Sequence, residues 1–155
     1  MSKSAVCDNV IQKMESHLEE MNPGMDAKFT EACVVNDAIW QGDLCLTIVE
    51  MSDDQLKNLG YEKLEKISKK DLQLVPEGGE GSRHILSHAD GVELFRPKSW
   101  GEEDSLVGPI LRLNKENVVE HPRHGNVTIP AGFSVSCTYQ REYDEEQKRE
   151  RRARD

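Results

Sequence analysis

Histidines are the residues of this sequence with the clearest potential for chemistry, and four of the five lie in two close pairs. His84 and His88 are four residues apart in a stretch that alternates like a strand, so both can lie on one face. His121 and His124 flank a Pro-Arg dipeptide at a turn before another strand. If the two segments are neighbours, four imidazoles and a nearby glutamate form a ligand set that suits zinc, iron or nickel. The pattern therefore allows a site for a divalent transition metal.

The turn that follows the second pair is similar to part of a known metal-binding fold. Ile129-Pro130-Ala131-Gly132 resembles the Pro-x-Gly turn of cupin barrels, which implies a cupin-like metal-binding protein or metal-dependent enzyme. No histidine follows this turn, however, and no His-x-His precedes it, and a cupin metal site requires both. The alternative is that these are turn and surface histidines, with His121 in the extended backbone that precedes a proline.

Other catalytic patterns are incomplete. No Gly-x-Ser-x-Gly motif is present, and the glycine-rich loop at 76–82 lacks the Gly-Lys-Ser/Thr of a phosphate-binding loop. None of the four cysteines forms a Cys-x-x-Cys pair, so we interpret them as reduced thiols of a cytosolic protein. Cys137, on an alternating strand, is interpreted as a small buried apolar residue. The sequence thus favours a protein that is not an enzyme and needs no cofactor.

The C-terminal end offers a different kind of site. The stretch Gln140-Arg141-Glu142-Tyr143 closes the last predicted strand, and an arginine beside a tyrosine can anchor an interface. From Asp144 onward acids come first and bases last, an order that suits a helix dipole and predicts a short exposed helix. The residues expected to contact a partner are Arg141, Tyr143, Arg149, Arg151 and Arg152.

The net charge of the chain limits the kinds of partner that it can bind. The formal net charge of −9 argues against a general nucleic-acid binder, although the arginine-rich tail keeps an accessory nucleic-acid role as a third hypothesis. The same charge argues against docking on anionic membranes, and no run of 18 apolar residues could span one. The N-terminus lacks the apolar core of a secretory signal. We expect a cytoplasmic protein, or a virion protein if a phage encodes it.

The first part of the chain predicts helices and then a strand. Residues 8–22 place five apolar residues on one helical face: Val10, Ile11, Met14, Leu18 and Met21. Residues 25–40 allow either a second helix or short strands, and we favour the helix. Residues 44–49 are the most apolar run and predict a buried strand. Ser52 and Gln55 form a capping-box pattern that predicts a helix ending near Gly60.

From residue 83 onward the pattern is β. Asp90-Gly91 between two short apolar runs predicts a hairpin, and residues 126–129 and 133–139 alternate on either side of the Pro-Ala-Gly turn. We therefore predict a mainly β or α+β protein with a small antiparallel barrel or sandwich of about seven or eight strands. Its predicted parts are an N-terminal helical arm (1–40), a β-rich body (41–143) and a charged C-terminal helix (144–155).

Several short motifs resemble an uncharacterised family of small β-rich proteins from bacteria and their phages. They are Gly42-Asp43-Leu44, Gly81-Ser82-Arg83-His84, His121-Pro122-Arg123-His124-Gly125, Ile129-Pro130-Ala131-Gly132 and Gln140-Arg141-Glu142-Tyr143. The resemblance covers residues 41–143 and implies an architecture but no activity. Members of the family carry Gly-His-x-His where this chain has Gly-Ser-Arg-His, which weakens the metal hypothesis.

The leading functional hypothesis is a structural or interaction protein that works as a homo-oligomer or as a subunit of a larger assembly, such as a phage particle. It depends on the incomplete catalytic patterns, on the charged ends of the chain and on the resemblance. A small β body must also protect the edges of its sheets, and self-association is one way to do so.

Overall fold

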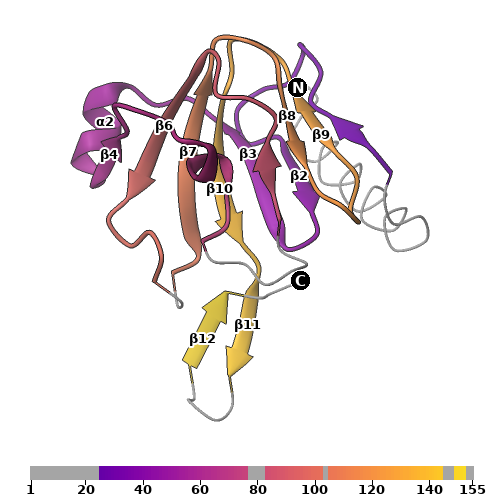
Figure 1. Ribbon diagram of the computed structural model, residues 1–155. Helices are drawn as coiled ribbons and strands as arrows, with labels where there is room; N and C mark the ends of the chain where they lie inside the picture. Colours follow the sequence, from indigo (N-terminus) through magenta and orange to yellow (C-terminus); the bar gives the residue numbers. More distant parts are fainter. Residues whose placement is uncertain (1–24, 77–82, 103–104, 145–148, 153–155) are drawn as a thin grey trace.

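In this computed structural model, residues 25–76, 83–102, 105–144 and 149–152 are described. Ten strands within these ranges form two β-sheets that pack face to face (Figure 1). The six-stranded sheet has the order β2 (Ala38–Gln41), β3 (Leu44–Val49), β10 (Ser134–Tyr139), β7 (Val107–Leu113), β6 (Val92–Pro97) and β4 (Tyr61–Lys63). The four-stranded sheet has the order β1 (Ala27–Lys28), β9 (Val127–Ile129), β8 (Asn117–Glu120) and β5 (Ile85–Leu86).

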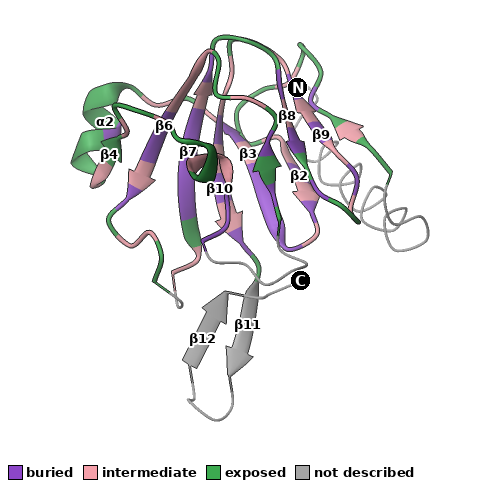
Figure 2. Cartoon of the chain, in the orientation of Figure 1, coloured by how far each residue is buried: buried purple, intermediate pink, exposed green. Residues whose placement is uncertain are grey.

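The alternation of buried and half-buried residues explains how the central strands are oriented in the sandwich. In β10, Val135, Cys137 and Tyr139 are buried while the residues between them are half-buried, as a strand with one core face requires. Its neighbour β3 pairs with it residue by residue, from Ser134 opposite Val49 to Tyr139 opposite Leu44. The buried and half-buried positions alternate along the strands in Figure 2. The apolar faces of the two sheets must therefore meet.

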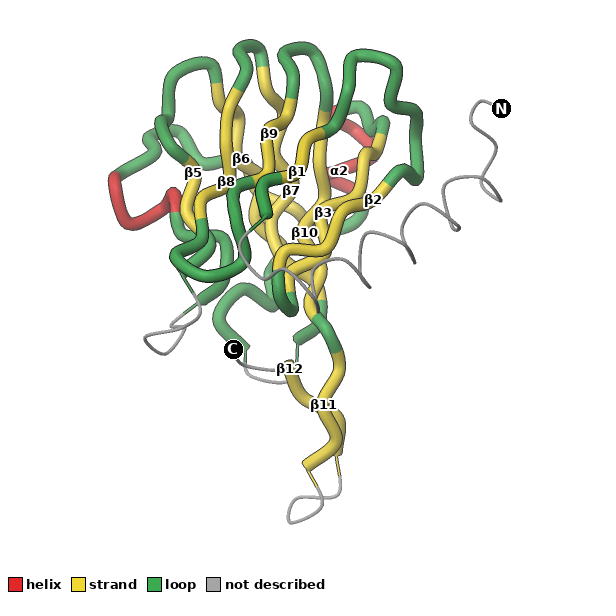
Figure 3. The backbone as a smooth tube through the Cα atoms, turned by 90° about the vertical axis from the view of Figure 1, so that its right-hand side faces the viewer, coloured by secondary structure: helices red, strands yellow, loops and turns green. Residues whose placement is uncertain are grey.

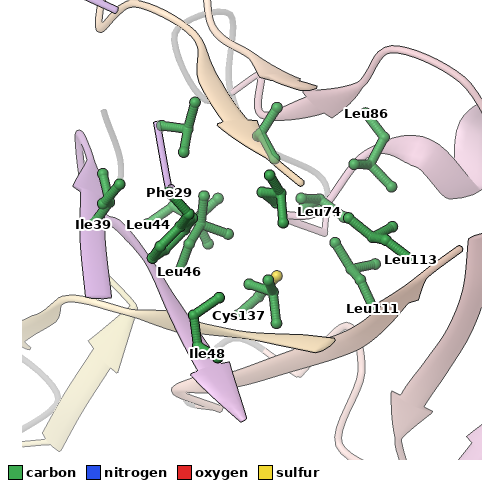
Figure 4. Close-up of a cluster of buried hydrophobic side chains, with 14 of the residues drawn as sticks. Phe29, Ile39, Leu44, Leu46, Ile48, Leu74, Leu86, Leu111, Leu113 and Cys137 are labelled. Carbon is green, nitrogen blue, oxygen red and sulfur yellow. The ribbon is translucent and has the colours of Figure 1, made fainter. Parts of the chain in front are cut away.

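One apolar core fills the space between the sheets (Figure 4). The six-stranded sheet contributes residues such as Leu46, Leu111 and Val135, and the four-stranded sheet contributes Leu86 and Ile129. Segments outside the two sheets add Phe29, Leu74 and Val75. Figure 3 looks onto the four-stranded sheet, with β1, β5, β8 and β9 in front of the larger sheet.

A short helix covers part of the outer face of the six-stranded sheet. Helix α2 (Asp53–Asn58) begins at Ser52, whose hydroxyl accepts a hydrogen bond from the Gln55 backbone N–H, while the Gln55 side chain accepts one from the Ser52 N–H. This is the capping box that the sequence predicts. Leu56 packs from the helix onto Phe95 and Ile110 in a second, smaller cluster.

A second short helical segment connects the two layers. The 3₁₀ helix η1 (Lys69–Leu72) is fixed by Asp71, whose carboxylate accepts hydrogen bonds from the Ser68 N–H and hydroxyl and from the Arg96 guanidinium. These bonds lower the pKa of Asp71, the backbone bond from Ser68 contributing most.

Two parts of the sequence-based fold are confirmed and several are corrected. A mainly β fold and the strand at 44–49 are confirmed. The barrel alternative is wrong for the described residues, because β2 and β4 form the ends of one sheet and β1 and β5 the ends of the other. The sheets are also not purely antiparallel, since β1 pairs with β9 in parallel.

The helix favoured for residues 25–40 is wrong: this stretch holds β1 and most of β2, joined by a turn. Its apolar residues pair with strands far along the chain, and that pairing overrides local preference. The Asp90-Gly91 hairpin is also wrong, because β5 pairs with β8 in one sheet while β6 pairs with β7 in the other. The helix predicted for residues 8–22 lies outside the described residues.

The charged C-terminal helix is replaced, where the tail is described, by a hairpin. Strand β11 (Arg141–Asp144) pairs antiparallel with β12 (Arg149–Arg152), so that Arg141 lies opposite Arg152 and Asp144 opposite Arg149. The hairpin forms a two-stranded sheet of its own and extends away from the two-layer body (Figures 1 and 3).

Candidate functional site

Three of the four predicted histidines meet at one edge of the sandwich. The ring of His84 lies against that of His121 with 4.5 Å between centroids, and His121 lies at the same distance from His124. His84 is fully buried and His121 is 5% exposed, whereas His124 is half-buried. We call these three side chains, together with Gln41 and Asp43, the histidine cluster.

Gln41 connects the parts of this cluster through its side-chain amide. Its amide nitrogen donates to the carbonyl oxygens of Val119, at 2.9 Å, and Gly125, at 2.7 Å, and its amide oxygen lies 2.8 Å from His84 Nδ1. Because an amide oxygen can only accept, Nδ1 of His84 must carry a proton. Gln41 is itself fully buried, so one side chain connects β2, β8, the turn after β8 and His84.

The second ring nitrogen of His84 faces a carboxylate. His84 Nε2 lies 3.6 Å from Asp43 Oδ1, which makes an ion pair only when the imidazole carries both protons. Asp43 comes at the start of β3 and is 6% exposed. Nδ1 donates to Gln41 and Nε2 faces Asp43, so neither nitrogen of this fully buried ring is directed at a substrate, and the ring is not placed as a general base.

His121 has a structural role in the turn 121–125. Its Nδ1 accepts hydrogen bonds from the backbone N–H groups of Arg123, at 3.0 Å, and His124, at 3.1 Å. A neutral His121 therefore carries its proton on Nε2. Metal-ligating histidines usually show the reverse arrangement, donating an N–H from the nitrogen that does not bind the metal. The geometry fits a histidine that closes a turn.

His88 has separate contacts. Its Nε2 donates to the Glu116 carbonyl at 3.0 Å, and its own carbonyl accepts from Asn117 Nδ2 at 2.8 Å. The strand β5 is two residues long, so it does not carry His84 and His88 on one face as the sequence suggested. Within the described ranges, no group of three or more His, Cys, Asp or Glu side chains is arranged to hold a metal ion.

Sequence reasoning did not identify Gln41 and Asp43 as members of the site. Both flank Gly42, which has a positive φ of 59° in the turn between β2 and β3. Their signal in the sequence is that two polar residues directly precede the most apolar strand of the chain. Both side chains are buried in the structure, and buried polar side chains need hydrogen-bond partners.

The described cysteines are poor nucleophiles. Burial raises the pKa of the Cys45 and Cys137 thiols, and burial together with the Asp37 carboxylate raises that of Cys33. A raised pKa keeps a thiol protonated and unreactive at neutral pH.

The predicted interaction residues are brought together by the C-terminal hairpin. Arg141 and Tyr143 lie on β11, and Arg149, Arg151 and Arg152 lie on β12. In register, Arg141 is opposite Arg152, Glu142 opposite Arg151 and Tyr143 opposite Glu150. The helix predicted for the tail is wrong where the tail is described, whereas the interaction role of these residues stays a prediction.

These features define a two-sheet β protein with a buried polar histidine cluster and a C-terminal β-hairpin. Residues 40–137 match the model of the family described as Domain of unknown function (DUF8820), and the protein belongs to this family. No curated protein and no solved structure matches the chain. The expected uncharacterised family is confirmed in this sense, whereas its distribution in bacteria and phages stays a prediction. No helix in the described parts of the chain is long and apolar enough to cross a bilayer.

Proposed function

We propose that this protein is a non-enzymatic interaction protein that assembles with further copies of itself through the β11–β12 hairpin. The observation that carries the proposal is that the hairpin stands apart as its own two-stranded sheet, outside both sheets of the body (Figures 1 and 3). An isolated two-stranded ribbon is marginally stable in water, so contact with another surface would stabilise it. Unpaired strand edges are a common means of adding one chain to another.

Charge supports a second copy as the partner. The 15 residues from Arg141 onward contain six bases and six acids, so the formal charge of −9 lies in residues 1–140. Strand β12 contains three arginines and one glutamate. A basic strand on one copy is therefore complementary to the acidic body of another, and such complementarity favours and orients association.

The hairpin contains residue types that anchor interfaces. Its two strands hold four arginines and Tyr143. Tyrosine and arginine are among the residues that most often anchor interfaces, so the hairpin is the expected contact element.

The test is the charge-reversal variant R151E/R152E, compared with R83E/R123E. The control changes two exposed arginines of the body and alters the net charge by the same amount. We expect sedimentation equilibrium to show self-association of the native chain, weakened at least tenfold by R151E/R152E and by added salt, as for electrostatic contacts. The control variant should associate like the native chain.

Three results would contradict the proposal. One is a strict monomer at high concentration with no partner recovered from the native source. Another is an equal effect of the two charge-reversal pairs, which would assign association to net charge alone. A third is salt-dependent binding of nucleic acid that disappears when residues 145–155 are removed, which would assign the arginines to a nucleic-acid role.

A second candidate function, metal binding, rests on the contact among the rings of His84, His121 and His124. Against it, His121 Nδ1 accepts two backbone hydrogen bonds, and no group of described side chains is arranged to hold a metal ion. It predicts stoichiometric zinc, iron or nickel in the purified protein and its loss from the variant H121A/H124A. Elemental analysis of both proteins decides the matter. If the native chain holds no stoichiometric metal, and H121A/H124A leaves association unchanged, the cluster is structural.

A further inference from the structure

A groove opens where β3 ends and β10 begins, at an end of the sandwich away from the histidine cluster. Its volume is about 540 Å³, within the range of pockets that bind apolar groups, roughly 300–1,000 Å³. Most of its lining is apolar and includes Val34, Val35, Val49, Met51 and Phe133. Val34 and Val35 are 40% and 45% exposed, so one wall presents two adjacent valines to solvent.

The turn that carries these valines is fixed by hydrogen bonds. The Val34 N–H donates to Asp37 Oδ2 at 2.9 Å, the Asp37 N–H returns a bond to the Val34 carbonyl at 3.0 Å, and the Asn36 N–H donates to the Ile48 carbonyl at 2.9 Å. Asn36 has a positive φ of 79°, which asparagine tolerates better than most residues. The groove is thus a formed surface that exposes two adjacent valines, which a partner with an apolar face would cover.

Arg112, the one arginine in the lining, already has partners and does not make the groove an anion-binding site. Arg112 donates to Asp53 at 2.6 Å, to Glu93 at 2.9 Å and to the Met51 carbonyl at 3.0 Å. Arg112 is thus already paired with two carboxylates, and Glu50 is the other charged residue of the lining, so apolar side chains form most of the remaining surface. An amphipathic helix, with one apolar face, is the chemistry that such a groove accommodates.

We propose that residues 8–22 of the same chain dock in this groove as an amphipathic helix. This segment lies outside the described residues, and its sequence places Val10, Ile11, Met14, Leu18 and Met21 at helical spacing. Two of the five are methionines, which fit irregular apolar surfaces well.

The reach of the chain supports docking within one molecule. Asp26 is fixed beside β9 by the hydrogen bond from the Asn126 N–H, and β1 then runs parallel to β9 toward the residues that line the groove. From Asn126 to Pro130 the extended chain covers roughly 13 Å. A helix of 15 residues is about 22 Å long, so a segment that turns back at residues 23–24 reaches the groove.

Limited trypsin digestion of the full chain tests the proposal through the cut after Lys13. We expect this cut to be at least tenfold slower than in a synthetic peptide of residues 1–24, because docking protects the segment. The variant V35D should raise the rate several-fold. Its matched control is V107D, since Val107 is 43% exposed and lies outside the groove, and V107D should leave the rate unchanged.

A second pair of variants tests the segment itself. M14D disrupts the apolar stripe and should increase cleavage, whereas S16D, on the opposite helical face, should not. Protection should not depend on protein concentration, and R151E/R152E should not alter it, which separates this inference from the proposed self-association. Cleavage of the native chain at the rate of the peptide, equal effects of V35D and V107D, or protection lost on dilution, as docking on a second copy would give, would each overturn it.

Discussion

At the scale of single residues, Gln41 holds the histidine cluster together. One amide contacts the carbonyl groups of Val119 and Gly125 and the ring of His84, and all of these contacts are buried. Each of them joins residues far apart in the sequence. The cluster therefore depends on a hydrogen-bond donor and acceptor at one position, and an apolar residue of similar size would leave several polar groups without partners.

We predict that Q41L lowers the free energy of unfolding by roughly 3–5 kcal/mol, because a buried polar group that loses its partner costs about 1–3 kcal/mol. Urea denaturation at neutral pH measures the change. The matched control is Q140L, which makes the same substitution at an exposed glutamine. Exposed sites usually change stability by less than about 0.5 kcal/mol. Equal losses in the two variants would show that the buried hydrogen bonds of Gln41 do not stabilise the fold.

The sequence could indicate which histidines are close but not what they do. Grouping His121 with His124 followed from their spacing, and the convergence of His84 with them was a hypothesis that the ring contacts support. Their roles depend on partners distant in the sequence, such as Gln41 for His84. Spacing in one strand or turn carries no information about such partners.

At the scale of elements, helix α2 has one residue that attaches it to the sheet. Leu56 is 1% exposed and packs on Phe95 and Ile110, whereas Leu59, at the end of the helix, is 61% exposed. A helix of six residues has little intrinsic stability in water, so this packing must hold it in place.

We predict that L56A destabilises the protein by roughly 2–4 kcal/mol, since it removes buried methyl groups and leaves a cavity. L59A should cost less than about 0.5 kcal/mol, because its side chain is already in solvent. Thermal and urea unfolding of both variants measure the difference. Similar losses would mean that α2 is held by its capping box and not by Leu56.

Local signals predicted those elements that depend on local contacts. The capping box of Ser52 and Gln55 is made by residues three apart, and it identified α2 correctly. By contrast, β1 pairs with β9, about 100 residues away along the chain, and no local pattern in residues 25–40 indicates that pairing. The tail has a charge order that suits a helix, yet residues 141–144 and 149–152 pair as strands.

At the scale of the molecule, the sequence favoured a mainly β body but could not choose between a barrel and a sandwich. That choice depends on whether the outer strands pair with each other, which involves β1, β2, β4 and β5. Strand β1 and most of β2 lie in residues 25–40, for which the sequence favoured a helix. The folded unit also extends beyond the family match at residues 40–137, because β1 and the first half of β2 come before it.

This difference yields a prediction about fragments of the chain. A fragment of residues 40–137 lacks Phe29, Ile39 and Tyr139, which are 6%, 8% and 6% exposed in the core. Burial of one large apolar side chain contributes about 1.5–3 kcal/mol, so the three together approach the whole stability of a typical domain, about 5–15 kcal/mol. We expect this fragment to show no cooperative thermal transition. A fragment of residues 25–140 keeps both sheets and should unfold cooperatively in calorimetry. Cooperative unfolding of the 40–137 fragment would contradict the prediction, because it would show that the residues before position 40 and after position 137 are dispensable.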